Sequence, residues 1–133
     1  MCVFCKIVNG EIPCFKVYED EQFLGFLDIS QATKGHTLVI PKKHISDIFE
    51  LDNETAQNML GVVSHISRLL KTKLGVSSVN IINNSGKLAG QTVNHFHIHI
   101  IPRYENDNCK IEFVEHEPDF NMLKAVSYTH LTL

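Results

Sequence analysis

The sequence predicts an α+β domain in which a five-stranded antiparallel meander sheet carries one long helix on one face. Segments that favour strand or helix follow one another in the order strand, strand, strand, helix, strand, strand. The connections within the first three and the last two strands are short, which favours antiparallel neighbours. With 133 residues, 44% of them hydrophobic and 20% charged, the chain has the size and composition of one globular domain.

Each expected strand is a short alternating or continuously apolar segment bounded by turn residues. The five segments are residues 15–19, 23–27, 36–40, 79–82 and 93–101. Two weaker helical patterns lie outside this series. A short helical or turn segment is expected within residues 2–12, and a weak helix at residues 120–126.

The long helix is the clearest element. Asp52 or Asn53 is a favourable N-cap, and Gly75 is a natural C-terminal stop. Between them, apolar residues recur at spacings of three and four and form one stripe that can face the sheet. The stripe consists of Ala56, Met59, Leu60, Val63, Ile66 and Leu70.

Charge and hydropathy exclude several classes of partner. The net charge is −3, and no basic run exceeds the pair Lys42–Lys43, so the sequence predicts no binding to nucleic acid or to an anionic membrane. No apolar run is long enough for a transmembrane helix. No secretory leader is recognisable, so a cytoplasmic location is expected. The four cysteines are then expected to be reduced thiols or metal ligands.

Three histidines alternate along the last expected strand, where residues 95–101 read His-Phe-His-Ile-His-Ile-Ile. Strand side chains alternate between faces, so His95, His97 and His99 are expected to share one face. Three interpretations are open. They could be satisfied surface or core histidines, ligands of a transition metal, or catalytic groups, since a neutral imidazole can attack phosphorus and its neighbours can move protons.

The loop before this strand favours phosphate chemistry. It contains two glycines, whose backbone N–H groups can form an anion-binding turn, together with polar side chains. The polar groups able to donate to phosphate oxygens are Asn84, Gln91 and Thr92. A glycine-rich polar loop that leads into a three-histidine strand is a stronger signal than either feature alone.

Cys2 and Cys5 form a C-x-x-C pair. Tetrahedral zinc would need two further ligands, and His44 and His95 are the best candidates. A filled Cys2His2 site has no open position, so such a zinc would be structural. A redox dithiol and two inert buried thiols are the alternatives.

These residues resemble the histidine triad (HIT) family of nucleotide hydrolases and transferases, whose mark is His-φ-His-φ-His-φ-φ with φ apolar. His95–Ile101 satisfies it at every position. Gly90-Gln91-Thr92 is similar to the segment before the triad in Hint-type members. Residues 26–30 and 35–44 are similar to the family's nucleotide-binding strand and loop, so the resemblance covers about residues 2–104.

The resemblance implies a role for each residue. His97 would attack the α-phosphate of a purine nucleoside phosphoramidate or dinucleoside polyphosphate, and water would resolve the nucleotidyl-histidine. His99 would contact the phosphoryl oxygens. The implied nucleotide-binding residues are Asp28 for the ribose, Ile29 with Phe4, Ile7 and Phe26 for the base, Asn84, Gly90, Gln91 and Thr92 for the phosphate, and His36 at the edge of the triad.

The resemblance also implies an assembly and a cofactor. Bacterial-type Hint-like members carry a structural zinc, whose ligands here would be Cys2, Cys5, His44 and His95, and no organic cofactor is expected. A homodimer would join two sheets into one of ten strands. We expect a single HIT domain over residues 1–126, and residues 127–133 stay unassigned. The alternatives are a nucleotide-binding regulatory module with little catalysis and a zinc-dependent hydrolase.

Overall fold

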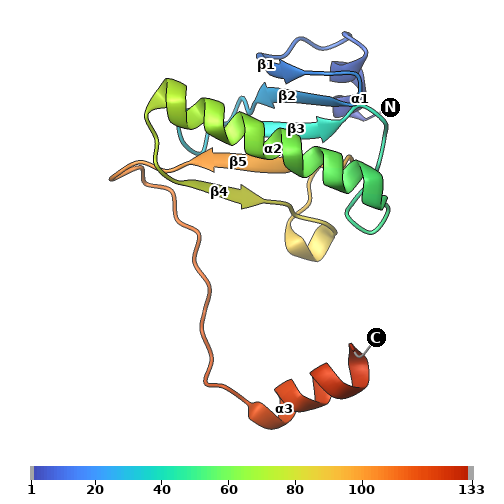
Figure 1. The fold of residues 1–133 in the computed structure, drawn as a ribbon, viewed down its shortest axis with the longest axis vertical. Helices are drawn as coiled ribbons and strands as arrows, with labels where there is room; N and C mark the ends of the chain where they lie inside the picture. The colour runs from blue at the N-terminus through green and yellow to red at the C-terminus, as the bar shows by residue number, and fades with distance from the viewer. Residues whose placement is uncertain (1, 132–133) are drawn as a thin grey trace.

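A computed structural model describes residues 2–131 and shows an open five-stranded antiparallel sheet, as expected (Figure 1). The sheet has the strand order β1-β2-β3-β5-β4. Its strands are β1 (Lys16–Glu19), β2 (Phe23–Leu27), β3 (Thr37–Pro41), β4 (Val79–Ile82) and β5 (Ile98–Pro102). The helices are α1 (Val3–Val8), α2 (Asn53–Leu74), the 3₁₀ turn η1 (Lys87–Ala89), α3 (Phe120–Ala125) and the π-helical turn η2 (Val126–His130).

The sheet departs from the predicted meander at one place. β5 lies between β3 and β4, so the chain leaves α2, forms the edge strand β4 and then returns inward. β5 is the more apolar of the two, with Ile100 and Ile101 buried, whereas Ile81 in β4 is 46% exposed. A strand buried on both faces is stabilised in the interior of the sheet, which explains the exchange of places.

Helix α2 lies across one face of the sheet (Figure 1). Asp52 is its N-cap, and the carboxylate accepts a hydrogen bond from the Thr55 N–H at 3.0 Å. Gly75 ends the helix at φ 70°, a conformation that glycine adopts without strain. Leu60 is 63% exposed, so its expected place in the core-facing stripe is wrong, and Val62 is buried instead.

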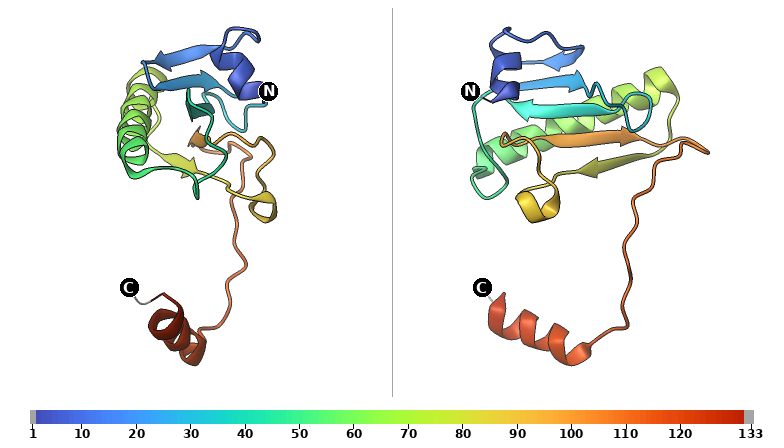
Figure 2. Two further views of the ribbon diagram at one scale, coloured as in Figure 1. Left: turned by 90° about the vertical axis from the view of Figure 1, so that its right-hand side faces the viewer. Right: turned by 180° about the vertical axis from the view of Figure 1, so that it is seen from behind.

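Helix α1 lies against the opposite face of the sheet (Figure 2). Successive residues of β2 point to opposite faces of the sheet. Phe23 packs in the core beneath α2, and Leu24 packs in a second core with Phe4 of α1. The molecule therefore has a large core on the α2 side and a smaller one on the α1 side. The smaller core adjoins the functional site.

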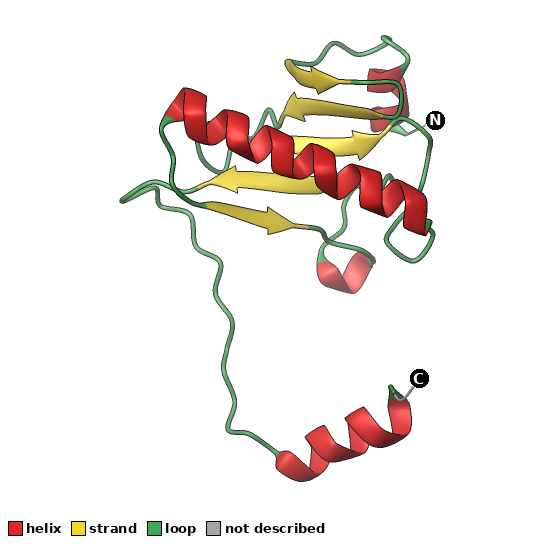
Figure 3. Cartoon of the chain, viewed as in Figure 1, coloured by secondary structure: helices red, strands yellow, loops and turns green. Residues whose placement is uncertain are grey.

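Beyond β5 the chain runs in an extended path to α3 and η2, which stand apart from the sheet (Figures 1 and 3). The weak helix expected at residues 120–126 is present as α3. Within the unassigned tail, residues 127–130 belong to η2, and residues 132–133 lie outside the described part of the chain. Among the described helices, none is long and apolar enough to cross a membrane.

Candidate active site

The three triad histidines lie at and before the start of β5. The strand was expected over residues 93–101 but begins at Ile98, so only His99 lies in the sheet ladder. His95 and His97 precede the strand in a segment anchored by the Phe96 N–H, which donates to the Ile45 carbonyl at 2.6 Å. Phe96 is buried in the core under α2. The ring centroids of His97 and His99 lie 5.1 Å apart.

His97 and His99 open into a cavity of about 420 Å³ on the α1 side of the sheet. Helix α1 contributes apolar side chains to the lining, and polar groups from other segments complete it. The nucleotide-binding residues expected from the sequence that line it are Asp28, Ile29, Asn84, Gly90 and Thr92. Ile29 is 88% exposed at the rim, so an apolar ligand could cover it.

His97 has its tautomer set by one hydrogen bond. Its Nδ1 lies 2.7 Å from the His95 carbonyl oxygen, which can only accept, so Nδ1 carries the proton. In the neutral ring, Nε2 then carries the lone pair. A buried imidazole that lines a cavity and has a free Nε2 lone pair is suited to nucleophilic attack.

His36 and His99 form a second, ordered pair. The Ala32 N–H donates to His36 Nδ1 at 3.1 Å, so the His36 proton is on Nε2. That proton is donated to His99 Nδ1 at 2.9 Å, and the remaining His99 proton is therefore on Nε2. Burial, and then the neighbouring rings of His97 and His36, lower the pKa of His99 to about 4. His99 is thus a neutral ring that presents an N–H donor.

His36 is itself buried and does not line the cavity. Burial lowers the pKa of His36, and the Asp28 carboxylate partly opposes this shift. The Asp28 Oδ2 atom lies 3.7 Å from His36 Nε2, while Oδ1 accepts from the Ser30 N–H at 2.7 Å. Oδ2 retains lone pairs that can accept from a ligand hydroxyl.

Gln91 has a different position from the one expected. It does not line the cavity, and both ends of its side chain are engaged by the backbone. Oε1 accepts from the Gly86 N–H at 2.8 Å, and Nε2 donates to the Ser46 and Val93 carbonyls. These bonds hold residues 86–93 against the segment after β3. The expected contact of Gln91 with phosphate is therefore not supported by this geometry.

Two polar residues that the sequence analysis did not single out also position the site. Asn83 Nδ2 donates to the His97 carbonyl at 2.9 Å. The Gln31 amide makes four backbone hydrogen bonds, accepting from Gly35 and His36 and donating to Asp28 and His36. It thereby fixes the loop that carries both Asp28 and His36. Neither residue has a distinctive spacing in the sequence.

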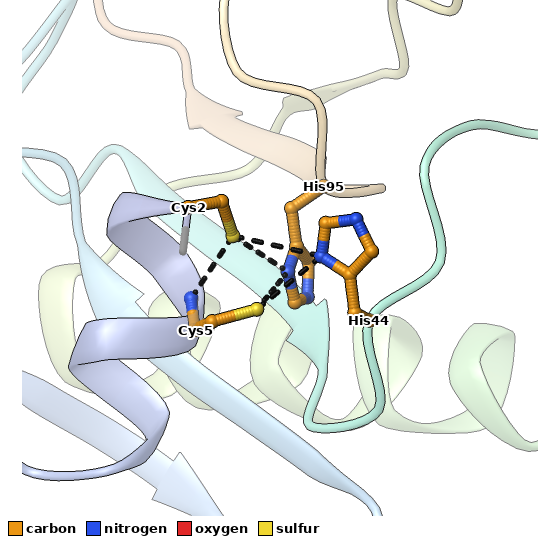
Figure 4. Close-up of side chains that lie close together, drawn as sticks. All are labelled: Cys2, Cys5, His44 and His95. Atoms are coloured by element: carbon orange, nitrogen blue, oxygen red, sulfur yellow. Dashed lines mark hydrogen bonds between the residues drawn. The ribbon is translucent and has the colours of Figure 1, made fainter.

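Cys2, Cys5, His44 and His95 converge, as the sequence predicts (Figure 4). The four sulfur-to-Nδ1 distances are between 3.2 and 3.6 Å. Tetrahedral zinc with ordinary bond lengths places sulfur and nitrogen ligands about 3.6 Å apart. His95 Nε2 donates to the Pro41 carbonyl at 2.7 Å, so its Nδ1 lone pair faces the two sulfurs. The residues therefore fit a zinc ion.

A second group, Asp28, His36 and His99, also brings three potential ligand atoms together. Its hydrogen bonds argue against a metal. Because Ala32 donates to His36 Nδ1, the neutral His36 ring has its proton on Nε2, where a metal would have to bind. His97 belongs to neither ligand group among the described residues. The geometry thus favours a triad that acts directly over a triad that binds a catalytic metal.

Several known proteins are similar to this chain in sequence. Residues 9–106 match the HIT domain family. An uncharacterized HIT-like protein of Methanocaldococcus jannaschii is 53% identical over 115 residues, covering 86% of this chain and 88% of that protein. Adenosine 5'-monophosphoramidase hnt1 of Schizosaccharomyces pombe is 43% identical over 102 residues (77% and 74%). Adenylylsulfatase HINT3 of Arabidopsis thaliana is 44% identical over 106 residues (80% and 54%).

Solved structures of similar proteins have the same fold. A crystal structure of a Streptococcus mutans protein superposes with a TM-score of 0.91 at 52% identity, covering 95% of this chain and 80% of that chain. A zinc-bound histidine triad family protein from Mycobacterium smegmatis has a TM-score of 0.78 at 44% identity (89% and 84%). The sheet, the triad beside a cavity and these matches define one class of protein. The chain belongs to the HIT domain family.

Proposed function

We propose that this protein is a nucleotide hydrolase or transferase that attacks the α-phosphate of a purine nucleoside phosphoramidate or dinucleoside polyphosphate. One observation carries the proposal: the His97 Nδ1 proton is held by the His95 carbonyl, so the Nε2 lone pair is available to the cavity. The names of hnt1 and HINT3, an adenosine monophosphoramidase and an adenylylsulfatase, support an adenylyl group as the part attacked.

The reaction has two displacements at phosphorus. His97 Nε2 forms a bond to the α-phosphorus, and the bond from phosphorus to the leaving amine or phosphate breaks. The leaving group takes a proton from solvent as it departs, and the water that attacks in the second step returns a proton to solvent. Water then attacks the nucleotidyl-histidine, the P–N bond breaks, and a nucleoside monophosphate is released. The His99 Nε2–H is oriented to stabilise negative charge on the phosphoryl oxygens, because His36 fixes the tautomer of His99.

The cavity offers a place for each part of the nucleotide. Phe4, Ile7 and Phe26 form an apolar slot that suits the base, with Ile29 at its rim. Asp28 Oδ2 can accept from the ribose hydroxyls. Asn84, Gly90 and Thr92 line the same cavity as His97 and His99 and would bind the phosphate.

The four potential zinc ligands, Cys2, Cys5, His44 and His95, are called the metal cluster below, and in this proposal they have a structural role. Cys2, Cys5, His44 and His95 would hold zinc and fill its tetrahedral coordination. Through these four residues, α1 would be linked to the segments after β3 and before β5 when zinc is bound. None of the four described cysteines forms a disulfide, which suits the reducing cytoplasm expected from the sequence.

We also propose a homodimer through β4, which would join two sheets into one of ten strands. β4 pairs with β5 along one edge, and β4 is the last strand of the described sheet. The exposed side chains of Ile81 on β4 and Leu60 on α2 lie on elements that this association could cover. Sedimentation equilibrium of the full chain should give twice the monomer mass of 15.1 kDa, and a monomer mass would contradict the dimer.

The covalent intermediate is the direct test of the reaction. Rapid alkaline quench, which preserves the acid-labile P–N bond, of the protein with an α-labelled adenosine phosphoramidate should leave label on His97, located by peptide mapping. Turnover of the phosphoramidate and of diadenosine tetraphosphate on the same sample should rank the two substrate classes. Tight AMP binding with neither turnover nor labelled protein would favour the alternative of a regulatory nucleotide-binding module.

A further inference from the structure

The helix that precedes the sheet belongs to two sites at once. Cys2 caps α1 and Cys5 lies in its first turn, so the helix carries half of the metal cluster (Figure 4). The same helix contributes Val3, Phe4 and Ile7 to the cavity wall. One helix of six residues thus joins the metal cluster to the slot that suits the base.

Phe4 is the side chain that connects them. It is buried, and its ring makes edge contacts with His97 at 5.1 Å and Phe26 at 5.6 Å between centroids. It also contacts the ring of the metal-cluster residue His95 at 5.9 Å. The position of Phe4 therefore shapes the base slot beside the nucleophile.

Helix α1 depends on side chains for its attachment. A six-residue helix has little stability of its own. Its backbone hydrogen bonds to the chain around it are made within residues 2–12. The links to distant elements are the apolar packing of Phe4, Ile7 and Val8 and the metal cluster, whose other members are His44 and His95.

We propose that metal occupancy of the Cys2–Cys5–His44–His95 cluster sets the affinity of the cavity for the nucleoside base. With zinc bound, α1 is tied to the segments that carry His44 and His95, and Phe4 is held against Phe26 and His97. Without it, α1 is retained by apolar packing and by weak thiol–imidazole hydrogen bonds, and the base slot loses its fixed wall. The inference rests on the proposed nucleotide site and adds a means of regulating it.

The phosphate end of the cavity should respond differently. Asn84 and Thr92 come from the loop before β5 and His99 from β5 itself, so no part of α1 carries these groups. Metal loss should weaken ligands that contain a base more than ligands that do not. This difference separates a specific coupling from general loosening of the fold.

The first experiment compares AMP with ribose 5-phosphate by titration calorimetry. The full chain is measured zinc-loaded, after chelation, and after zinc is restored. Chelation should raise the AMP dissociation constant about tenfold, reversibly, and change that of ribose 5-phosphate less than about twofold. Unchanged AMP binding, or equal losses for both ligands, would overturn the inference. Zinc-loaded protein that binds neither ligand would instead refute the proposed nucleotide site, and this inference with it.

A second experiment uses variants of the same full chain. His44→Ala removes a metal ligand that lies outside both α1 and the cavity, and Lys43→Ala is the matched neighbour that leaves the cluster intact. His44→Ala should lower zinc content and weaken AMP binding as chelation does, while Lys43→Ala should do neither. Equal AMP affinity in His44→Ala and Lys43→Ala, with zinc lost only from the first, would contradict the coupling.

A thermodynamic cycle tests the route through Phe4. In Phe4→Ala the wall is already removed, so chelation should cause no further loss of AMP affinity beyond about twofold. A full tenfold loss in that background would overturn the role of Phe4. Far-UV circular dichroism of each sample checks that the sheet persists, and ribose 5-phosphate binding checks that the phosphate end persists.

Discussion

His36 Nε2 lies 2.9 Å from His99 Nδ1, and this contact fixes which nitrogen of His99 faces the substrate cavity. The order begins one step earlier, where the Ala32 N–H donates to His36 Nδ1. A backbone amide thus orients two imidazoles in sequence. The outer ring, His99, is a neutral N–H donor beside the cavity.

His36→Asn should lower kcat while leaving AMP affinity within about threefold, because His36 does not line the cavity. Loss of the tautomer control on His99 should reduce kcat about ten- to a hundredfold. The ¹⁵N chemical shifts of His99 should show mixed tautomers in the variant. His65→Asn, on the exposed side of α2, is the matched control; a similar loss of turnover there would contradict the orienting role.

His97→Gly should abolish the labelled protein intermediate and lower turnover by about three orders of magnitude or more, because the nucleophile is gone. The cavity left behind should admit free imidazole. Added imidazole should restore part of the rate and release the nucleotide as its imidazolide. Wild-type turnover in the variant would contradict covalent catalysis by His97.

Asp28→Asn should weaken binding of AMP about tenfold, since an amide is a poorer acceptor for ribose hydroxyls than a carboxylate. Asn can still accept the Ser30 N–H bond that Asp28 Oδ1 now accepts, so the loop should persist. Binding of 2',3'-dideoxy-AMP should be almost the same in both proteins. Equal losses for the two ligands would show that Asp28 does not contact the ribose.

The free energy of unfolding should fall as pH decreases from about 6.5 to about 4. His99 has a lowered pKa of about 4 in the folded protein, so within this window the unfolded chain binds more protons than the native state. Burial shifts the pKa of His36 in the same direction. Above this window the stabilisation is complete.

His99→Gln should reduce the steepness of that pH dependence, measured by urea unfolding at several pH values. The substitution removes a titrating ring and retains a polar side chain at the position. His116→Gln, on the exposed chain beyond β5, is the control and should leave the slope unchanged. An unchanged slope in His99→Gln would contradict the lowered pKa.

The elements of the fold that could be predicted from the sequence are those that local patterns define. The cap at Asp52, the stop at Gly75 and the apolar periodicity between them define α2. The order of β4 and β5 could not be predicted in the same way. It depends on which strand is better covered by side chains from distant parts of the chain, and no local pattern contains that comparison.

The candidate site also has a part that local spacing predicts and a part that it does not. The spacings of the triad and the Cys2–Cys5 pair are local, and both groups converge as expected. The surroundings of Gln91 could not be predicted from spacing, because its partners are backbone groups, among them the Ser46 carbonyl, 45 residues away. Asn83 likewise bonds to the His97 carbonyl, 14 residues away, which the fold brings near. Gln31 bonds to backbone groups three to five residues away, and no motif spacing marks that loop in the sequence.

Because β5 begins only at Ile98, the two histidines that line the cavity are held by different kinds of backbone. His99 is mounted in the hydrogen-bonded ladder, whereas His97 lies on a short segment held by the Ile45 carbonyl and the Asn83 amide. The position of His97, the proposed nucleophile, can therefore be altered at Asn83 without disturbing a strand. Substitutions there offer evolution, or a protein engineer, a way to accommodate leaving groups of different size while the donor at His99 stays fixed.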